Sequence, residues 1–83
     1  MRIDKFLKNS RLIKRRTIAK EACEQGRILI NDRVAKPGSN VDIGDAVIIE
    51  FATKKIKIRV NSTPDHVTKE MADSMYEIID GSL

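Results

Sequence analysis

The stretch RLIKRRTIAKEACEQGRILI, residues 11–30, contains the change of period that decides the fold. Its middle part places Ile, Ala, Ala and Cys at helical spacing, after Thr17 as a suitable N-cap and before Gly26 as a typical helix stop. The Arg-Ile-Leu-Ile run that follows has lost this period and is typical of a short strand. We therefore predict a helix over residues 18–25 and a strand over residues 27–30.

A shorter helix is predicted before this stretch. Ile3, Phe6 and Leu7 stand at the i, i+3, i+4 spacing of an amphipathic helix, which we place over residues 3–9. The connector between the two helices is strongly basic.

Turn signals and alternating patterns follow the first strand. Asn31-Asp32 is suited to a tight turn, because both residue types tolerate the left-handed conformation, so residues 33–35 are expected to complete a hairpin. Residues 46–51 are predicted to form a strand that connects through residues 52–55 to another. In that last strand, residues 56–60, aliphatic and basic side chains alternate, which predicts one buried face and one basic face.

The C-terminal part is expected to add a helix. Pro64 interrupts the chain, and residues 68–79 place apolar residues on one side and acidic residues on the other, with Thr68 as N-cap. The predicted fold class is α+β: two N-terminal helices packed on a small, twisted, mostly antiparallel β-sheet, plus a C-terminal helix. We expect a domain over residues 1–60 and a C-terminal extension, residues 61–83, whose helix packs on it.

The charge of the 83-residue chain is unevenly distributed. Residues 1–38 carry eleven Lys or Arg against four Asp or Glu, and residues 39–83 carry five against eight, which gives balances of +7 and −3 and the net charge of +4. Such asymmetry favours a basic face that binds a polyanion. The single cysteine and the lack of a signal peptide or a long apolar run predict a cytoplasmic protein.

The basic connector ends at a predicted helix start. Arg15 and Arg16 directly precede Thr17, where unpaired backbone N–H groups and the helix dipole favour an anion. Guanidinium groups there would add bidentate donors. The sequence therefore predicts a phosphate-binding corner, although Arg16 pairing with a local acid such as Glu21 is the alternative.

Aromatic side chains for base stacking are scarce. Phe6 and Phe51 lie in apolar patterns and are predicted to belong to the core, and Tyr76 is the only tyrosine. Contacts with phosphates and with helix shape would then dominate, which favours folded RNA over single strands. A DNA-reading helix is disfavoured, because the cations precede the helix instead of lying on it.

Catalytic chemistry finds no support in the sequence. His66 is the only histidine and has no evident dyad, while Cys23 falls on the apolar side of its helix and is expected to be a buried thiol. One Cys and one His cannot build a structural zinc site. We expect no enzyme activity, no catalytic residues, no metal site and no cofactor.

The motifs MRIDKFLK, RLIKRRTIAKEA, GRILIN, AKPG and GDAVII resemble, in order and spacing, the RNA-binding domain named after small-subunit ribosomal protein S-four, also called the alpha-L motif. The resemblance implies that the start of the second helix contacts structured RNA. Arg16, Thr17 and Ala19 match its Arg-x-x-Ala core, and Arg2 and Asp4 match its opening Arg-x-Asp. Asp4 is then expected to brace the arginines. The family often has Asn-Gly where this chain has Asn-Asp.

Over its whole length the chain is similar to the RqcP factors of bacterial ribosome-associated quality control, relatives of the fifteen-kilodalton ribosome-binding heat-shock protein. The resemblance implies a factor that binds obstructed large ribosomal subunits through rRNA and peptidyl-tRNA. It would support C-terminal alanine tailing of stalled chains together with an RqcH-type tailing factor, and would be monomeric off the ribosome. The RNA-binding residues it implies are Arg2, Lys5, Lys8, Arg11, Lys14, Arg15, Arg16, Thr17, Lys20 and Arg27.

Two other functions remain open. One is a heat-shock ribosome-binding protein that recycles free large subunits carrying a nascent chain. The other is a protein-interaction adaptor that uses the acidic face of the C-terminal helix.

Overall fold

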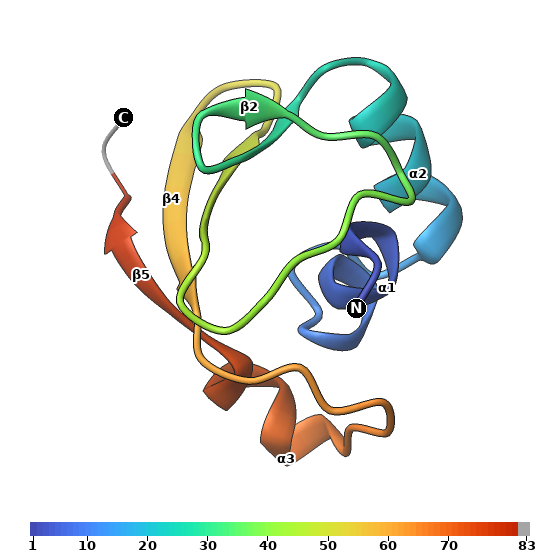
Figure 1. The fold of residues 1–83 in the computed structure, drawn as a ribbon, viewed down its shortest axis with the longest axis vertical. Coiled ribbons are helices and arrows are strands. Elements are labelled where there is room, and N and C mark those ends of the chain that lie inside the picture. The colour runs from blue at the N-terminus through green and yellow to red at the C-terminus, as the bar shows by residue number, and fades with distance from the viewer. Residues whose placement is uncertain (82–83) are drawn as a thin grey trace.

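The computed structural model describes residues 1–81, arranged as helices on a five-stranded sheet (Figure 1). The strand order is β2-β1-β3-β4-β5, and every neighbouring pair is antiparallel. The elements are α1 (Ile3–Asn9), α2 (Arg16–Glu24), β1 (Ile28–Ile30), β2 (Arg33–Val34), β3 (Ala46–Glu50), β4 (Lys55–Val60), α3 (Lys69–Ala72), the 3₁₀ turn η1 (Asp73–Met75) and β5 (Tyr76–Asp80). The predicted α+β class is confirmed.

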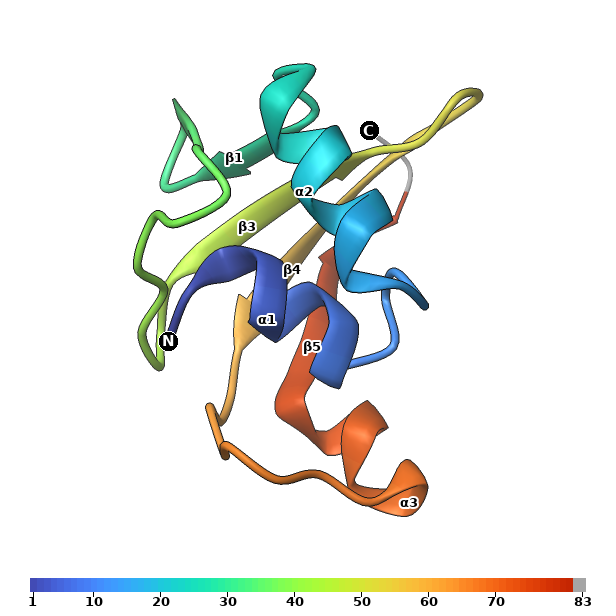
Figure 2. The same ribbon diagram turned by 90° about the vertical axis from the view of Figure 1, so that its right-hand side faces the viewer.

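One hydrophobic core lies between the two N-terminal helices and the sheet. Figure 2 shows α1 and α2 side by side on the same face of the strands. Phe6 and Leu7 of α1 are fully buried there, together with Val47 of β3 and Ile58 of β4. Each such side chain contributes about 1.5–3 kcal/mol when buried, so this layer fixes the helices on the sheet. Within residues 1–81, each helix is too short or too polar to cross a bilayer.

The start of α1 is held by a distant loop. The backbone N–H groups of Ile3 and Asp4 donate to the carbonyls of Ser39 and Pro37, at 2.8 and 3.3 Å. These bonds satisfy donors that the helix itself leaves unpaired. The N-terminus of α1 is thereby fixed against the segment between β2 and β3.

The predicted turn and strand patterns are confirmed. Asn31 and Asp32 both have positive φ, 49° and 67°, as a two-residue hairpin of the primed type requires. In β4, Ile56, Ile58 and Val60 are buried and alternate with basic residues. Helix α1 has the predicted bounds.

The predicted start of the second helix is wrong by two residues. Arg16 is the first helical residue of α2, and Arg15 occupies the N-cap position with an extended backbone and no side-chain cap bond. Thr17 therefore lies inside the first turn and does not cap the helix. The C-terminus follows the prediction, because Gly26 adopts a φ of +75° directly after the C-cap Gln25.

The predicted C-terminal helix is correct only at its beginning. Thr68 is the N-cap, and its hydroxyl accepts a hydrogen bond from the Met71 N–H at 3.3 Å. The helix ends at Ala72, and residues 76–80 form β5 instead of two further helical turns. Pairing with β4 satisfies the open edge of that strand, as in the Ile78–Ile58 pair, and this outweighs a helical period shared by a short apolar run.

Ile78 and Ile79 therefore lie exposed on an edge strand and do not form the apolar side of a helix. Ala72 and Met75 are buried, as expected. The division of the chain at residue 60 stays a prediction. The last strand nevertheless belongs to the same sheet as the strands before it.

Candidate nucleic-acid interface

A buried carboxylate joins two of the predicted RNA-binding arginines. Asp4, in the first turn of α1, is only 2% exposed. It accepts hydrogen bonds from Arg2 Nε and Nη2, both at 3.2 Å, and from Arg16 Nη2 at 3.5 Å. Its Oδ1 also accepts the backbone N–H of Lys5 at 2.8 Å. Arg16 does pair with an acid, but this acid is Asp4, 12 residues away, and not a local one such as Glu21.

The arginine pair remains open to solvent. The side chains of Arg2 and Arg16 are 55% and 48% exposed, although the carboxylate between them is covered. A guanidinium carries five N–H donors, and the contacts with Asp4 use at most two on each arginine. The remaining donors are available to a phosphate, and the buried carboxylate restricts how the two guanidinium groups are oriented.

The start of α2 adjoins this pair. Arg16 begins the helix, no side chain caps it, and its first turn contains no acidic residue. Backbone N–H groups and the helix dipole at such a terminus attract an anion. Arg15 and Thr17 are both exposed at this position. Four predicted residues, Arg2, Arg15, Arg16 and Thr17, thus lie around one uncapped helix start.

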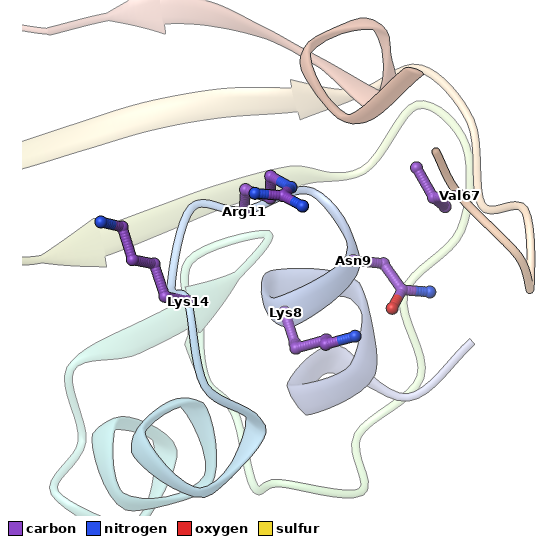
Figure 3. Close-up of a pocket in the computed structure, with 5 residues that line it drawn as sticks. All are labelled: Lys8, Asn9, Arg11, Lys14 and Val67. Carbon is purple, nitrogen blue, oxygen red and sulfur yellow. The ribbon is translucent and has the colours of Figure 1, made fainter. Parts of the chain in front are cut away.

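A second basic site lies at the end of α1 (Figure 3). A pocket of about 190 Å³ is lined by Lys8, Asn9, Arg11, Lys14 and Val67. Among residues 1–81, none of its three cations takes part in a salt bridge. Their charge is therefore not compensated locally, in contrast to that of Arg2 and Arg16.

Arg11 has an unusual backbone. Its φ is +63°, the left-handed conformation that ends many helices and that glycine normally occupies. A residue with a side chain pays about 1–2 kcal/mol for it. Strain of this kind is concentrated at functional positions. Here the positive φ also has a structural reason, because Arg11 directly follows the C-cap Ser10 of α1.

The other predicted residues are more dispersed. Lys5 is less available to a phosphate, because its Nζ lies 3.2 Å from Asp65 Oδ1 of the C-terminal segment. Lys20 is exposed on α2, and Arg27 is exposed between α2 and β1. The Asp65 contact, 60 residues away in sequence, could not be expected from local patterns.

Two of the three cations on the basic face of β4 have acidic cross-strand partners. Lys55 lies 3.8 Å from Glu50 of β3, and Arg59 lies 3.3 Å from Glu77 of β5. These cross-strand partners offset part of the charge of the strand. The cations around α1 and α2 are accordingly the better candidates for polyanion binding.

The residues with reactive side chains do not form a catalytic site. Burial, with the nearby charges of Asp4 and Glu24, raises the pKa of the Cys23 thiol to about 11, so it remains protonated at neutral pH. His66 is exposed. In the described part of the chain, no three His, Cys, Asp or Glu side chains gather as metal ligands would.

Two apolar residues, Phe51 and Ile18, are more exposed than their sequence patterns indicate. Phe51 is 37% exposed and does not belong to the core as predicted. It follows the last residue of β3, so it has the same orientation as Val47 and Ile49 but lies beyond the end of the strand. Ile18, 47% exposed on α2, drew no attention as a surface residue. Its place in the apolar helical pattern gave no sign of this exposure.

Comparison with known proteins identifies close relatives. Residues 1–47 match the S4 domain family. A protein of Halalkalibacterium halodurans named RQC P-site tRNA stabilizing factor is 53% identical over 78 residues, covering 94% of this chain and 89% of the relative. A Bacillus subtilis protein of the same name is 52% identical over 79 residues, covering 95% and 92%. The trimeric structure of Vibrio cholerae heat shock protein 15 has a TM-score of 0.87 at 26% identity, over 94% of this chain and 80% of that one.

Proposed function

Because this chain belongs to the S4 domain family, and within it to the RQC P-site tRNA stabilizing factors, we propose that it binds large ribosomal subunits obstructed by peptidyl-tRNA. It contacts the rRNA and the P-site tRNA and supports alanine tailing of the stalled chain, together with an RqcH-type tailing factor. The family is non-enzymatic, so the proposed activity is binding. The site of action is the cytoplasm, and the factor is monomeric off the ribosome.

The observation that carries the proposal is the Arg2–Asp4–Arg16 cluster at the uncapped start of α2. It combines two oriented guanidinium groups with backbone donors, which suits the phosphates of a folded RNA better than a base sequence. The basic pocket of Lys8, Arg11 and Lys14 supplies further phosphate contacts. Together they account for binding without catalytic groups.

The quality-control function is preferred over the heat-shock alternative because of sequence identity. Two of the relatives named as tRNA stabilizing factors are 52–53% identical, whereas the heat-shock protein is 26% identical. The alternative of a protein-interaction adaptor is less well supported, since the helix expected to present the acidic face ends at Ala72.

The test is co-sedimentation with large ribosomal subunits, with and without peptidyl-tRNA, at several salt concentrations. Wild type should bind more tightly when peptidyl-tRNA is present. Arg16→Ala should lose at least about tenfold in affinity, because charge-assisted hydrogen bonds to a phosphate are lost. The matched control is Arg33→Ala, on the edge strand β2 outside the predicted set.

Two outcomes would contradict the proposal. Arg16→Ala and Arg33→Ala binding equally well would remove the site. A wild-type affinity that does not depend on salt would point to a protein interface, because phosphate contacts release counterions.

A further inference from the structure

An apolar groove opens beside the phosphate-binding corner. It has a volume of about 230 Å³ and lies between α2, the connector before it and the turn that joins β3 to β4. Its lining includes seven apolar residues: Leu12, Ile13, Ile18, Ala22, Ile49, Phe51 and Ala52. The groove is distinct from the basic pocket at the end of α1.

The groove combines a buried residue with exposed apolar side chains. Ile49 is 1% exposed, while Ile18 and Phe51 are 47% and 37% exposed. The backbone at Phe51 is held by a 2.7 Å hydrogen bond from its N–H to the carbonyl of Lys54. The turn therefore leaves a large aromatic ring partly exposed beside the exposed Ile18, so that apolar side chains are grouped at one place on the surface.

The surroundings of the groove identify RNA as the occupant. Leu12 and Ile13 of the groove belong to the basic connector that carries Arg11, Lys14 and Arg15, so the groove borders the segment that leads to the phosphate-binding corner. Arg27, which is exposed, and Glu50 also line it. An unpaired base has apolar faces and a polar edge, which correspond to an aromatic ring with charged donors and acceptors beside it.

The size of the groove supports a single ring system. Pockets that enclose drug-sized ligands have about 300–1,000 Å³, so this groove is small for them. A docked peptide helix or strand would need several separate anchor sites, whereas one base needs one.

We propose that this groove receives one unpaired nucleobase of the RNA whose phosphates lie at the start of α2, stacked on Phe51. The inference rests on the proposed function for the presence of RNA, and it adds a base contact to what would otherwise be backbone recognition. Phe51 is then a binding residue, and the hairpin turn is part of the RNA interface.

The first experiment measures the affinity of Phe51 variants for large subunits carrying peptidyl-tRNA. Phe51→Ala and Phe51→Leu should each lose about fivefold or more, because stacking on the ring is lost, while Phe51→Trp should bind as wild type. The slope of affinity against salt should stay unchanged, since no phosphate contact is removed. Ile43→Ala is the matched control, because Ile43 is an exposed aliphatic residue that does not line the groove.

Each result decides the inference. Wild-type binding by Phe51→Leu would indicate an aliphatic or protein contact and overturn the stacked base, as would wild-type binding by Phe51→Ala. If Arg16→Ala weakens binding while the Phe51 variants do not, only the groove inference fails. If wild type does not bind large subunits, the proposed function fails first, and the groove inference fails with it.

A second experiment identifies the neighbour directly. Phe51 is replaced by photoreactive p-benzoyl-phenylalanine in the full chain, which is irradiated on the large subunit carrying peptidyl-tRNA. We expect a crosslink to RNA that stops reverse transcription at an unpaired nucleotide. A crosslink to a ribosomal protein, or none from a bound chain, would overturn the inference.

Discussion

Replacing Asp4 tests whether it braces the binding arginines. Asp4→Ala removes the acceptor of the Lys5 N–H bond and of the Arg2 and Arg16 contacts. The backbone bond to a buried carboxylate is worth about 1.5 kcal/mol, and contacts with half-exposed arginines add at most about 1 kcal/mol. The expected loss is about 2 kcal/mol, which lowers the Tm of a domain of this size by about 10 °C.

Asp4→Asn separates stability from binding, because the amide oxygen can still accept the Lys5 N–H bond. Its expected loss is about 1 kcal/mol, or about 5 °C in Tm. The variant also removes a negative charge beside a polyanion, so simple charge repulsion predicts tighter RNA binding. Bracing predicts the opposite sign: an affinity for large subunits that falls about fivefold, since Arg2 Nη2 loses its acceptor and both arginines lose the negative charge that orients them.

The assay pairs thermal unfolding with large-subunit binding at matched salt. Asp32→Asn, an exposed acid in the β1–β2 turn that makes the same charge change, is the control and should bind at least as tightly as wild type. Asp4→Asn binding as tightly as Asp32→Asn, with the protein folded, would refute the bracing role. It would leave Asp4 a structural residue of α1.

The remaining predictions concern one strained residue and one buried thiol. Arg11→Gly should keep or slightly raise the Tm, because relief of a positive φ offsets the greater entropy of unfolded glycine, yet it should lower the salt slope of RNA binding by about one. Arg11→Ala should lose the same slope without the relief, and an unchanged slope in both would exclude a phosphate contact. Because the pKa of Cys23 is about 9.0 unfolded and about 11 folded, stability should be full below pH 9 and fall between pH 9 and 11. The urea midpoint should therefore fall more between pH 8 and pH 10.5 for wild type than for Cys23→Ala. Burial also raises the pKa of Tyr76, but this contributes equally in both proteins. An equal fall in the two midpoints would contradict the pKa shift of Cys23.

Much of the fold could be predicted from local sequence patterns, because interactions between neighbouring residues produce these patterns. The helix over residues 3–9 was predicted with its observed bounds, since the spacing of Ile3, Phe6 and Leu7 matches one helical face. The alternation in β4 and the Asn31-Asp32 turn were predicted for the same reason, as period and backbone preference belong to neighbouring residues.

The candidate site was predicted as a set of residues but not as an arrangement. Arg16 at a helix start is visible in the sequence, and family resemblance suggested Asp4 as its brace. That one buried carboxylate joins Arg2 with Arg16, 14 residues apart, depends on how α1 packs against α2. The ion pair between Lys5 and Asp65 likewise depends on where the C-terminal segment lies.

The sequence by itself therefore determined the local elements of this protein and the basic character of its N-terminal half. Tertiary structure decided the rest. Residues 76–80 form a strand because the edge of β4 was open to pair with them, and a helical period in so short a run could not compete with that pairing. Phe51 lies at the surface because the hairpin carries it past the helices that cover Val47 and Ile49. Both outcomes depend on partners far away in the chain, which no local pattern specifies.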